Sequence, residues 1–275
     1  MATKISWCDE TWNAVVGCSR VSPGCANCYA AKEAASSKLQ QFEQYPVVSK
    51  WDGTVKYVES QLLKPFKWRQ PKRIFPCSMS DLFHSNVLDD WRDNIFAVMA
   101  ANPHHTFLVL TKRPENAVKY FSYPNRARWI THRACDLFRD ENKLRLKYGL
   151  NEINIKIPLP NVIIGATVEN QDMADKRIPL LLQIPAKLRW LSIEPLLGPV
   201  DLKLDGISWV VCGGESGAGY RMMDLTWLES IANQCDKAGV PLFVKQDSHF
   251  HSGKQGRINN ELWSKKQFPV IAENQ

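Results

Sequence analysis

The stretch that decides the fold is T-W-N-A-V-V-G-C-S-R-V-S-P-G-C-A-N-C-Y, residues 11–29. It opens with a short apolar run at 11–16 and continues into a loop that contains glycine, proline and three cysteines. A segment rich in alanine, lysine and glutamate follows at 29–41. This order predicts a β-strand, a loop that carries ligands, and then a helix. A strand followed by a helix is the repeating unit of parallel α/β folds.

The same unit recurs along the chain. Further apolar runs predict strands at 73–79, 106–111, 162–168, 188–193, 209–212 and 242–245, and helical patterns cover 87–101, 173–182 and 225–237. Strands that are apolar along their whole length and alternate with helices indicate a parallel sheet covered by helices. About seven strands are fewer than a full barrel needs. The expected fold is therefore α/β, an incomplete (partial) β/α TIM-like barrel, although an open doubly wound sheet fits the pattern nearly as well.

Two segments interrupt the alternation of strands and helices. Residues 47–73 interleave aromatic with basic side chains, and residues 123–157 are also predominantly basic. We interpret both as basic insertions in a single domain that covers 1–275. Within the first insertion, K-P-F-K-W-R-Q-P-K-R at 64–73 is the best candidate for nucleic-acid contact, because cations neutralise phosphates and Phe66 or Trp68 can stack on a base. A solvated basic face with its aromatic side chains packed inward explains the same stretch.

Composition restricts the location and the partners of the protein. No apolar stretch approaches the ~20 residues that cross a bilayer, and the N-terminus lacks the features of a signal peptide. We therefore expect a cytoplasmic protein without a membrane partner. The formal net charge of +7 permits an anionic partner such as DNA. Eight cysteines in a cytoplasmic chain favour metal binding or catalysis over disulfides.

Three of the cysteines are clustered as Cys18-x6-Cys25-x2-Cys28. Thiolates are soft ligands that select zinc, copper(I) or iron–sulfur clusters. Three thiolates hold a [4Fe–4S] cubane and leave one iron open, and that iron can bind the amino and carboxylate groups of S-adenosylmethionine (SAM). One electron from the cluster then releases a 5′-deoxyadenosyl radical. The alternative is a structural zinc site, which needs four ligands; here only Cys25 and Cys28 form a C-x2-C pair.

Polar residues at the ends of the predicted strands are the other candidates for the site. In a parallel barrel, functional side chains project from the carboxyl ends of the strands. Strand-end hydroxyls and carboxylates suit cofactor binding, and we assign this role to Ser78, Ser80, Asp81, Thr167, Glu169, Ser192 and Glu194. Lys245 can meet a carboxylate or phosphate, and Glu215 ends a G-G-E turn; with Cys212, they are the candidates for catalysis.

Several stretches carry a resemblance to a known family. The opening K-I-S-W-C-D-E-T-W-N-A-V-V-G-C-S-R-V-S-P-G-C-A-N-C-Y-A resembles a phage-associated radical-SAM-like family, often found beside three-Cys-motif partner proteins. The runs S-M-S-D-L-F-H (78–84), W-L-S-I-E-P-L-L-G-P (190–199), W-V-V-C-G-G-E-S-G (209–217) and A-G-V-P-L-F-V-K-Q (238–246) support the match. The cysteine spacing departs from the commoner radical SAM pattern C-x3-C-x2-C, which puts the orientation of the cluster in doubt.

The resemblance implies a fold, cofactors and a reaction. It implies a radical SAM barrel with a [4Fe–4S] cluster on Cys18, Cys25 and Cys28, SAM as cosubstrate, and an electron donor such as flavodoxin or ferredoxin. With the basic charge, it suggests radical rearrangement (isomerisation) of a modified thymine during DNA hypermodification in a phage-infected bacterial host. It also implies that the methionyl amine of SAM lies near residues 78–81.

Two other functions remain open. The chain resembles, more distantly, the radical SAM lyase that splits the spore photoproduct in DNA. Such lyases use a further cysteine as hydrogen donor, and Cys77 and Cys212 are the candidates on strands. The third hypothesis is a nucleic-acid-binding protein stapled by zinc and without catalysis.

Overall fold

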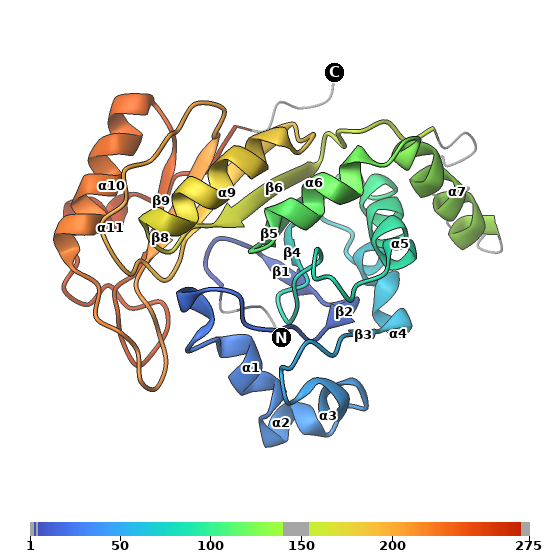
Figure 1. Ribbon diagram of the computed structural model, residues 1–275, viewed down its shortest axis with the longest axis horizontal. Coiled ribbons are helices and arrows are strands. Elements are labelled where there is room, and N and C mark those ends of the chain that lie inside the picture. Colours follow the sequence, from blue (N-terminus) through green and yellow to red (C-terminus); the bar gives the residue numbers. More distant parts are fainter. Residues whose placement is uncertain (1–2, 4, 140–153, 271–275) are drawn as a thin grey trace.

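Seven parallel strands form one curled sheet in the computed structural model, which describes residues 3, 5–139 and 154–270 (Figure 1). Along the sheet the strands follow their order in the chain: β1 (Glu10–Trp12), β4 (Arg73–Pro76), β5 (Thr106–Thr111), β6 (Val162–Thr167), β7 (Leu188–Ile193), β8 (Trp209–Gly213) and β9 (Leu242–Gln246). A doubly wound sheet reverses its strand order at a switch point, whereas a barrel does not. The expected parallel α/β half-barrel is confirmed, and the open doubly wound alternative is wrong.

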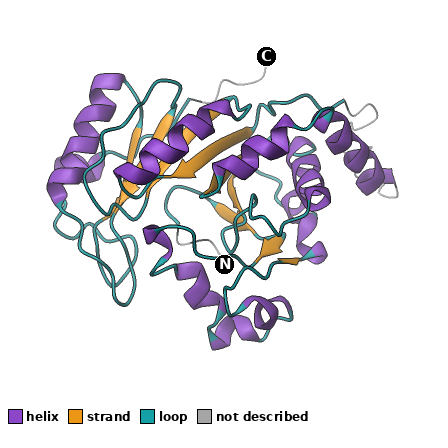
Figure 2. Ribbon diagram, viewed as in Figure 1, coloured by secondary structure: helices purple, strands orange, loops and turns teal. Residues whose placement is uncertain are grey.

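Helices cover the outer face of this sheet (Figures 1 and 2). They are α5 (Asp89–Ala100), α6 (Pro114–Ser122), α7 (Arg126–Arg139), α9 (Gln171–Gln183) and α10 (Leu225–Ala238), and α11 (Asn260–Ser264) lies beside β9. Helix α10 begins where Asp224 accepts a hydrogen bond from Thr226 N and ends at left-handed Gly239. Helices α6 and α7 were not predicted. No described helix has the length and apolar character to cross a membrane.

The chain between β1 and β4 forms a small lobe that carries the cysteine loop. The lobe contains β2 (Val15–Val16), a 3₁₀ turn (Pro23–Cys25), α1 (Tyr29–Ala34), α2 (Ser37–Gln40), α3 (Gln44–Val48), β3 (Lys56–Tyr57), α4 (Glu59–Leu62) and a second 3₁₀ turn (Lys64–Lys67). Strand β2 pairs with β3 and lies outside the main sheet. The cysteine loop therefore follows the short strand β2, which lies outside the main sheet.

Three predicted elements have different boundaries in the structure. The strand expected at 11–16 is split, because Asn13 turns the chain by accepting hydrogen bonds from Ser78 Oγ and Met79 N. The helix expected at 29–41 breaks where the Ser36 hydroxyl donates to the Glu33 carbonyl. The strand expected at 73–79 ends at Pro76, since Cys77 has a left-handed φ of 58° that a strand cannot hold.

Side-chain alternation along the strands divides the interior into two cores. One set of positions faces the hollow of the half-barrel, where Trp7 packs against Phe75, Trp190 and Trp209 at ring-centroid distances of 4.8, 5.1 and 6.4 Å. The alternate positions face the helices and join a larger outer core. The apolar floor of the half-barrel is thus made largely of aromatic rings.

Both basic insertions contribute to the outer core. Phe66 is 8% exposed and packs edge-on against Phe138 of α7, which lies next to α5. Trp68 packs on His105, and Arg73 pairs with Asp9. The stretch 64–73 leads into the amino end of β4, at the end of the sheet opposite the strand ends where the site was expected. The interpretation of Phe66 as a base-stacking residue is therefore wrong, because the Phe66 ring is buried in the outer core.

Gly165 lies on β6 against the Trp190 indole, which leaves no space for a side chain. A methyl group there would lie 2.4 Å from Trp190 Nε1, and that indole is fixed by its hydrogen bond to Val109 O. We predict that Gly165→Ala lowers the free energy of unfolding by about 1–3 kcal/mol through overpacking. Gly198→Ala is the matched control, because nothing lies within 4 Å of the added methyl group. Urea unfolding of both variants checks this; equal stabilities would contradict it.

Candidate functional site

A cavity of about 220 Å³ opens at the carboxyl ends of the strands, between the half-barrel and the cysteine loop. Of the residues that the sequence assigned to the cluster, the cofactor or catalysis, all but two line it: Cys18, Cys25, Cys28, Ser78, Ser80, Asp81, Thr167, Ser192, Glu194, Glu215 and Lys245. Glu169 and Cys212 do not. The sequence therefore located the site, and the structure shows what each group contacts there.

The inward positions change from apolar to polar as the strands reach the cavity. On β6, Ile163 and Gly165 lie in the apolar floor, and Thr167 is the next inward residue. On β7, Trp190 is followed at the same spacing by Ser192 and Glu194. These polar side chains consequently stand directly above the tryptophan layer.

The three clustered cysteines come from one loop and line one side of the cavity. Burial and the nearby Asp81 carboxylate raise the pKa of the Cys18 thiol to about 11, against the opposing effect of Arg113. Among the described residues, no three His, Cys, Asp or Glu side chains converge on a point where they could hold one metal ion. In a cubane each thiolate binds a different iron, so the sulfurs need not converge. Three thiolates are soft donors of the kind that such a cluster uses.

Glu169 ties the cysteine loop to the end of β6. Its carboxylate is fully buried, accepts a hydrogen bond from Ser22 Oγ, and pairs with Arg177 Nη1 at 2.7 Å. A methyl group on Gly24 would lie 2.4 Å from this carboxylate, so only glycine allows the loop to approach so closely. Glu169 was expected to bind cofactor; both of its oxygens instead have protein partners, and it anchors the loop.

Glu215 holds the same loop at Asn27 and, through Arg221, at Pro23. It accepts hydrogen bonds from Asn27 Nδ2 at 2.9 Å and from Arg221 N and Nε at 2.8 and 2.9 Å. Arg221 in turn donates to Pro23 O at 3.0 Å. Burial alone raises the pKa of Glu215, but the hydrogen bonds from Arg221 and Asn27 outweigh it and leave the pKa below its ordinary 4.5. The carboxylate expected in catalysis is therefore a second anchor of the loop.

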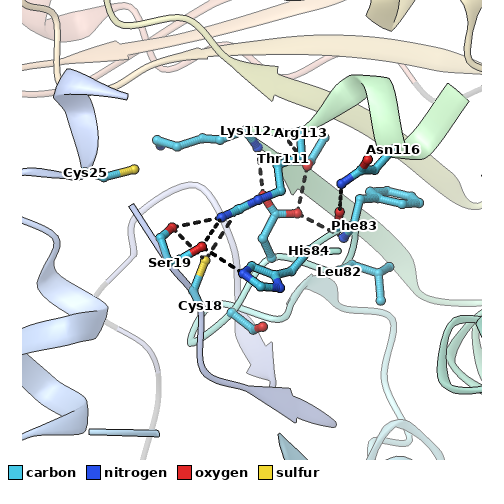
Figure 3. A network of polar contacts seen from close by, with 12 residues as sticks. Cys18, Ser19, Cys25, Leu82, Phe83, His84, Thr111, Lys112, Arg113 and Asn116 are labelled. Atoms are coloured by element: carbon cyan, nitrogen blue, oxygen red, sulfur yellow. Dashed lines mark hydrogen bonds and ion pairs between the residues drawn. The ribbon is translucent and has the colours of Figure 1, made fainter. Parts of the chain in front are cut away.

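Asp81 and Arg113 connect the loop to the end of β5 (Figure 3). Asp81 accepts from Thr111 Oγ1 at 2.7 Å, Phe83 N at 3.0 Å, Lys112 N at 3.0 Å and Arg113 Nη1 at 3.1 Å. Arg113 also donates to Cys18 Sγ at 3.4 Å and to Ser19 O at 2.8 Å. Because its carboxylate is fully used, Asp81 positions the arginine that contacts Cys18.

The wall opposite the cysteine loop has fewer internal contacts. Lys245 Nζ and Glu194 Oε1 form an ion pair at 2.7 Å, but this oxygen accepts no hydrogen bond from a described residue. Ser192 Oγ lies 3.5 Å from the other carboxylate oxygen, Glu194 Oε2. Thr167 Oγ1 is buried without a hydrogen-bond partner. This wall therefore keeps hydrogen-bonding capacity for a ligand.

Cys77 and Cys212 lie away from the cavity. Both belong to the outer core between sheet and helices, at 3% and 0% exposure. Cys212 occupies an outward position on β8, between the inward residues Val211 and Gly213. Burial raises the pKa of the Cys77 thiol to about 12 and that of Cys212 well above its ordinary value. We therefore withdraw Cys212 as a candidate for catalysis.

Sequence reasoning missed Ser22, Arg113 and Arg221, whereas the strand-end rule that selected Thr167 also points to Thr111 and Lys112. Arg113 is the next residue after Lys112, so the same rule could have been extended to it. Arg221 lies in a loop whose path no periodicity in the sequence reveals. Its partnership with Glu215 depends on the fold of residues 214–221.

The depressed pKa of Glu215 makes the loop anchor sensitive to acid. A group whose pKa is lower in the folded than in the unfolded protein contributes stability above the unfolded value, and that stability is lost as pH falls through the folded value. We predict that the stability difference between wild type and Glu215→Gln is largest near neutrality and shrinks as pH falls below about 4.5. Urea unfolding at a series of pH values measures it; a difference independent of pH would refute the role.

Comparison with known proteins identifies the family of the chain without naming a function. A family model described as "Protein of unknown function (DUF5131)" matches residues 2–267. No curated protein matches significantly, and no solved structure does. Since the match spans nearly all of the sequence, the half-barrel with its cysteine-lined cavity belongs to the DUF5131 family.

Proposed function

We propose that this protein is a radical SAM enzyme that binds a [4Fe–4S] cluster through Cys18, Cys25 and Cys28. The observation that carries the proposal is that one loop delivers these three thiols, and no other cysteine of the chain, to a cavity at the carboxyl ends of parallel strands. Three soft ligands rather than four leave a cluster one open iron.

The residues around the loop would hold it in position while the cluster is bound. Glu169 and Glu215 anchor it at Ser22 and Asn27, and the Arg113 guanidinium lies against Cys18 Sγ. A buried cation beside a thiolate ligand stabilises the negative charge of the cluster. When bound, the cluster supplies the electron that cleaves SAM to a 5′-deoxyadenosyl radical.

SAM would lie between the cysteine loop and the opposite wall. Ser192 and Glu194 have hydrogen-bonding capacity left for ribose hydroxyls. Asp81 and Glu169 do not, because protein groups already use their carboxylates. The hydroxyls of Ser78 and Ser80 likewise donate to Asn13 Oδ1 and Gly17 O. We therefore assign the ribose to the β7 end.

The proposed substrate is a nucleobase, most specifically a modified thymine in DNA that undergoes radical rearrangement during phage hypermodification. The resemblance of the sequence and the net charge of +7 support this choice. A base that reacts within this cavity must leave the helical stack or enter as a free nucleotide. An electron donor such as flavodoxin or ferredoxin would deliver the electron.

The two alternatives receive less support. The lyase hypothesis needs a further cysteine beside the substrate, and both of its candidates lie in the outer core. The zinc hypothesis needs four ligands around one ion, and the described His, Cys, Asp and Glu side chains do not converge in that way.

We predict that protein reconstituted anaerobically with iron and sulfide forms 5′-deoxyadenosine from SAM after reduction. Cys25→Ala removes one of three cluster ligands and should abolish both the brown colour and the product. Cys135→Ala is the matched control, because this thiol is exposed on α7, away from the cavity. Liquid chromatography of the product and analysis of bound iron measure the two outcomes. A colourless wild type that retains one zinc per chain would support the zinc hypothesis instead.

A further inference from the structure

Lys112 and Thr167 leave neighbouring strands side by side and face the cavity. The register of β5 and β6 pairs Thr111 with Ala166, so the next residue on each strand stands at the same level. Leu110 and Gly165 are the inward residues just below them, and alternation turns Lys112 and Thr167 to the same side. Both line the cavity.

Lys112 differs from the other cations that line the cavity. Arg113 pairs with Asp81, and Lys245 pairs with Glu194. Among the described residues, no carboxylate lies within ion-pair distance of Lys112 Nζ. In Figure 3 no dashed line joins the Lys112 side chain to another drawn residue, whereas its backbone N–H donates a hydrogen bond to Asp81 Oδ2. Of the three cations that line the cavity, Lys112 is therefore the one without a carboxylate partner in the described part of the chain.

Two buried polar groups at the cavity also lack a partner. Thr167 Oγ1, in a residue that is 1% exposed, makes no hydrogen bond with any residue that the structure describes, and neither does Trp7 Nε1 in the floor. A buried donor without an acceptor costs about 1–3 kcal/mol, and such groups are uncommon in folded proteins. Both can donate a hydrogen bond, and Lys112 supplies a cation. Two free donors and a cation that line the same cavity match the needs of an oxyanion.

We propose that Lys112 and Thr167, with Trp7 Nε1 below them, bind an anionic oxygen group of the substrate, either a carboxylate attached to the base or a nucleotide phosphate. The proposal rests on the proposed function, in which the carboxylate of SAM binds the open iron and does not need Lys112. Thr167, which the sequence predicted to bind the cofactor, is accordingly assigned to the substrate. A substrate that carries such an anion distinguishes this site from one for an unmodified base.

The test compares charged with neutral probes by calorimetry on the reconstituted protein, with and without saturating SAM. The probes are thymidine 5′-monophosphate, 5-carboxy-2′-deoxyuridine and uncharged thymidine. One charged probe should bind at least about tenfold more tightly than thymidine, because a hydrogen bond to a charged group stabilises more than a neutral one. The better charged probe identifies the source of the anion.

Variants assign the effect to the two side chains. Lys112→Met should remove the preference for the charged probe, Lys112→Arg should retain most of it, and Lys187→Met, exposed before β7 at the opposite end of the sheet, should leave it unchanged. Thr167→Val should weaken the charged probe severalfold without lowering the free energy of unfolding, since it deletes a hydroxyl that has no partner.

Two results would overturn the proposal. The first is that the charged probes bind no better than thymidine. The second is that Lys112→Met weakens SAM rather than the probes, which assigns the lysine to the carboxylate of SAM. Formation of 5′-deoxyadenosine is scored separately, so that a protein able to cleave SAM but indifferent to the charge of the probe refutes this inference alone.

Discussion

Side-chain alternation in a curled parallel sheet is the constraint on which the rest of the structure depends. Every second residue of a strand faces the hollow of the half-barrel, and the others face the helices. The inward set begins with aromatic rings and ends with polar groups, as Trp190 and Ser192 show on β7. On β6, β7 and β8 the outward set stays apolar to the strand ends, which places Cys212 in the outer core. A half-barrel built in this way has an apolar floor and a polar rim at the carboxyl ends of its strands.

The cysteine loop needs anchors because it lies outside the main sheet. Glu169 and Glu215, which follow β6 and β8, accept hydrogen bonds from residues of the loop, and each pairs with an arginine. A buried carboxylate is tolerated where it is paired and hydrogen-bonded. Removing one partner of such a pair would leave an uncompensated buried charge. The two ion-paired carboxylates therefore hold the cysteine loop in a fixed position relative to the ends of β6 and β8. The proposed cluster and the strand-end residues would consequently keep a fixed relation to one another.

The sequence predicted the sheet better than the lobe or the roles of the polar residues. The predicted bounds of the strands 106–111 and 188–193 are the same as the observed bounds, since buried parallel strands are apolar along their length. Helix α7 was missed because basic residues surround its buried Ile130 and Phe138. The strand-end rule selected Glu169 and Glu215 as part of the site. It could not distinguish ligand contact from loop anchoring, because their partners Ser22 and Asn27 are distant in the chain.

The central claim is that three thiolates hold an iron–sulfur cubane and leave one iron free for SAM. X-ray absorption at the iron edge, recorded on anaerobically reconstituted protein before and after addition of SAM, tests it most directly. The account predicts sulfur and iron neighbours around each iron, with nitrogen and oxygen neighbours gained when SAM is added. Spectra without iron–iron scattering, or spectra that SAM leaves unchanged, would contradict it.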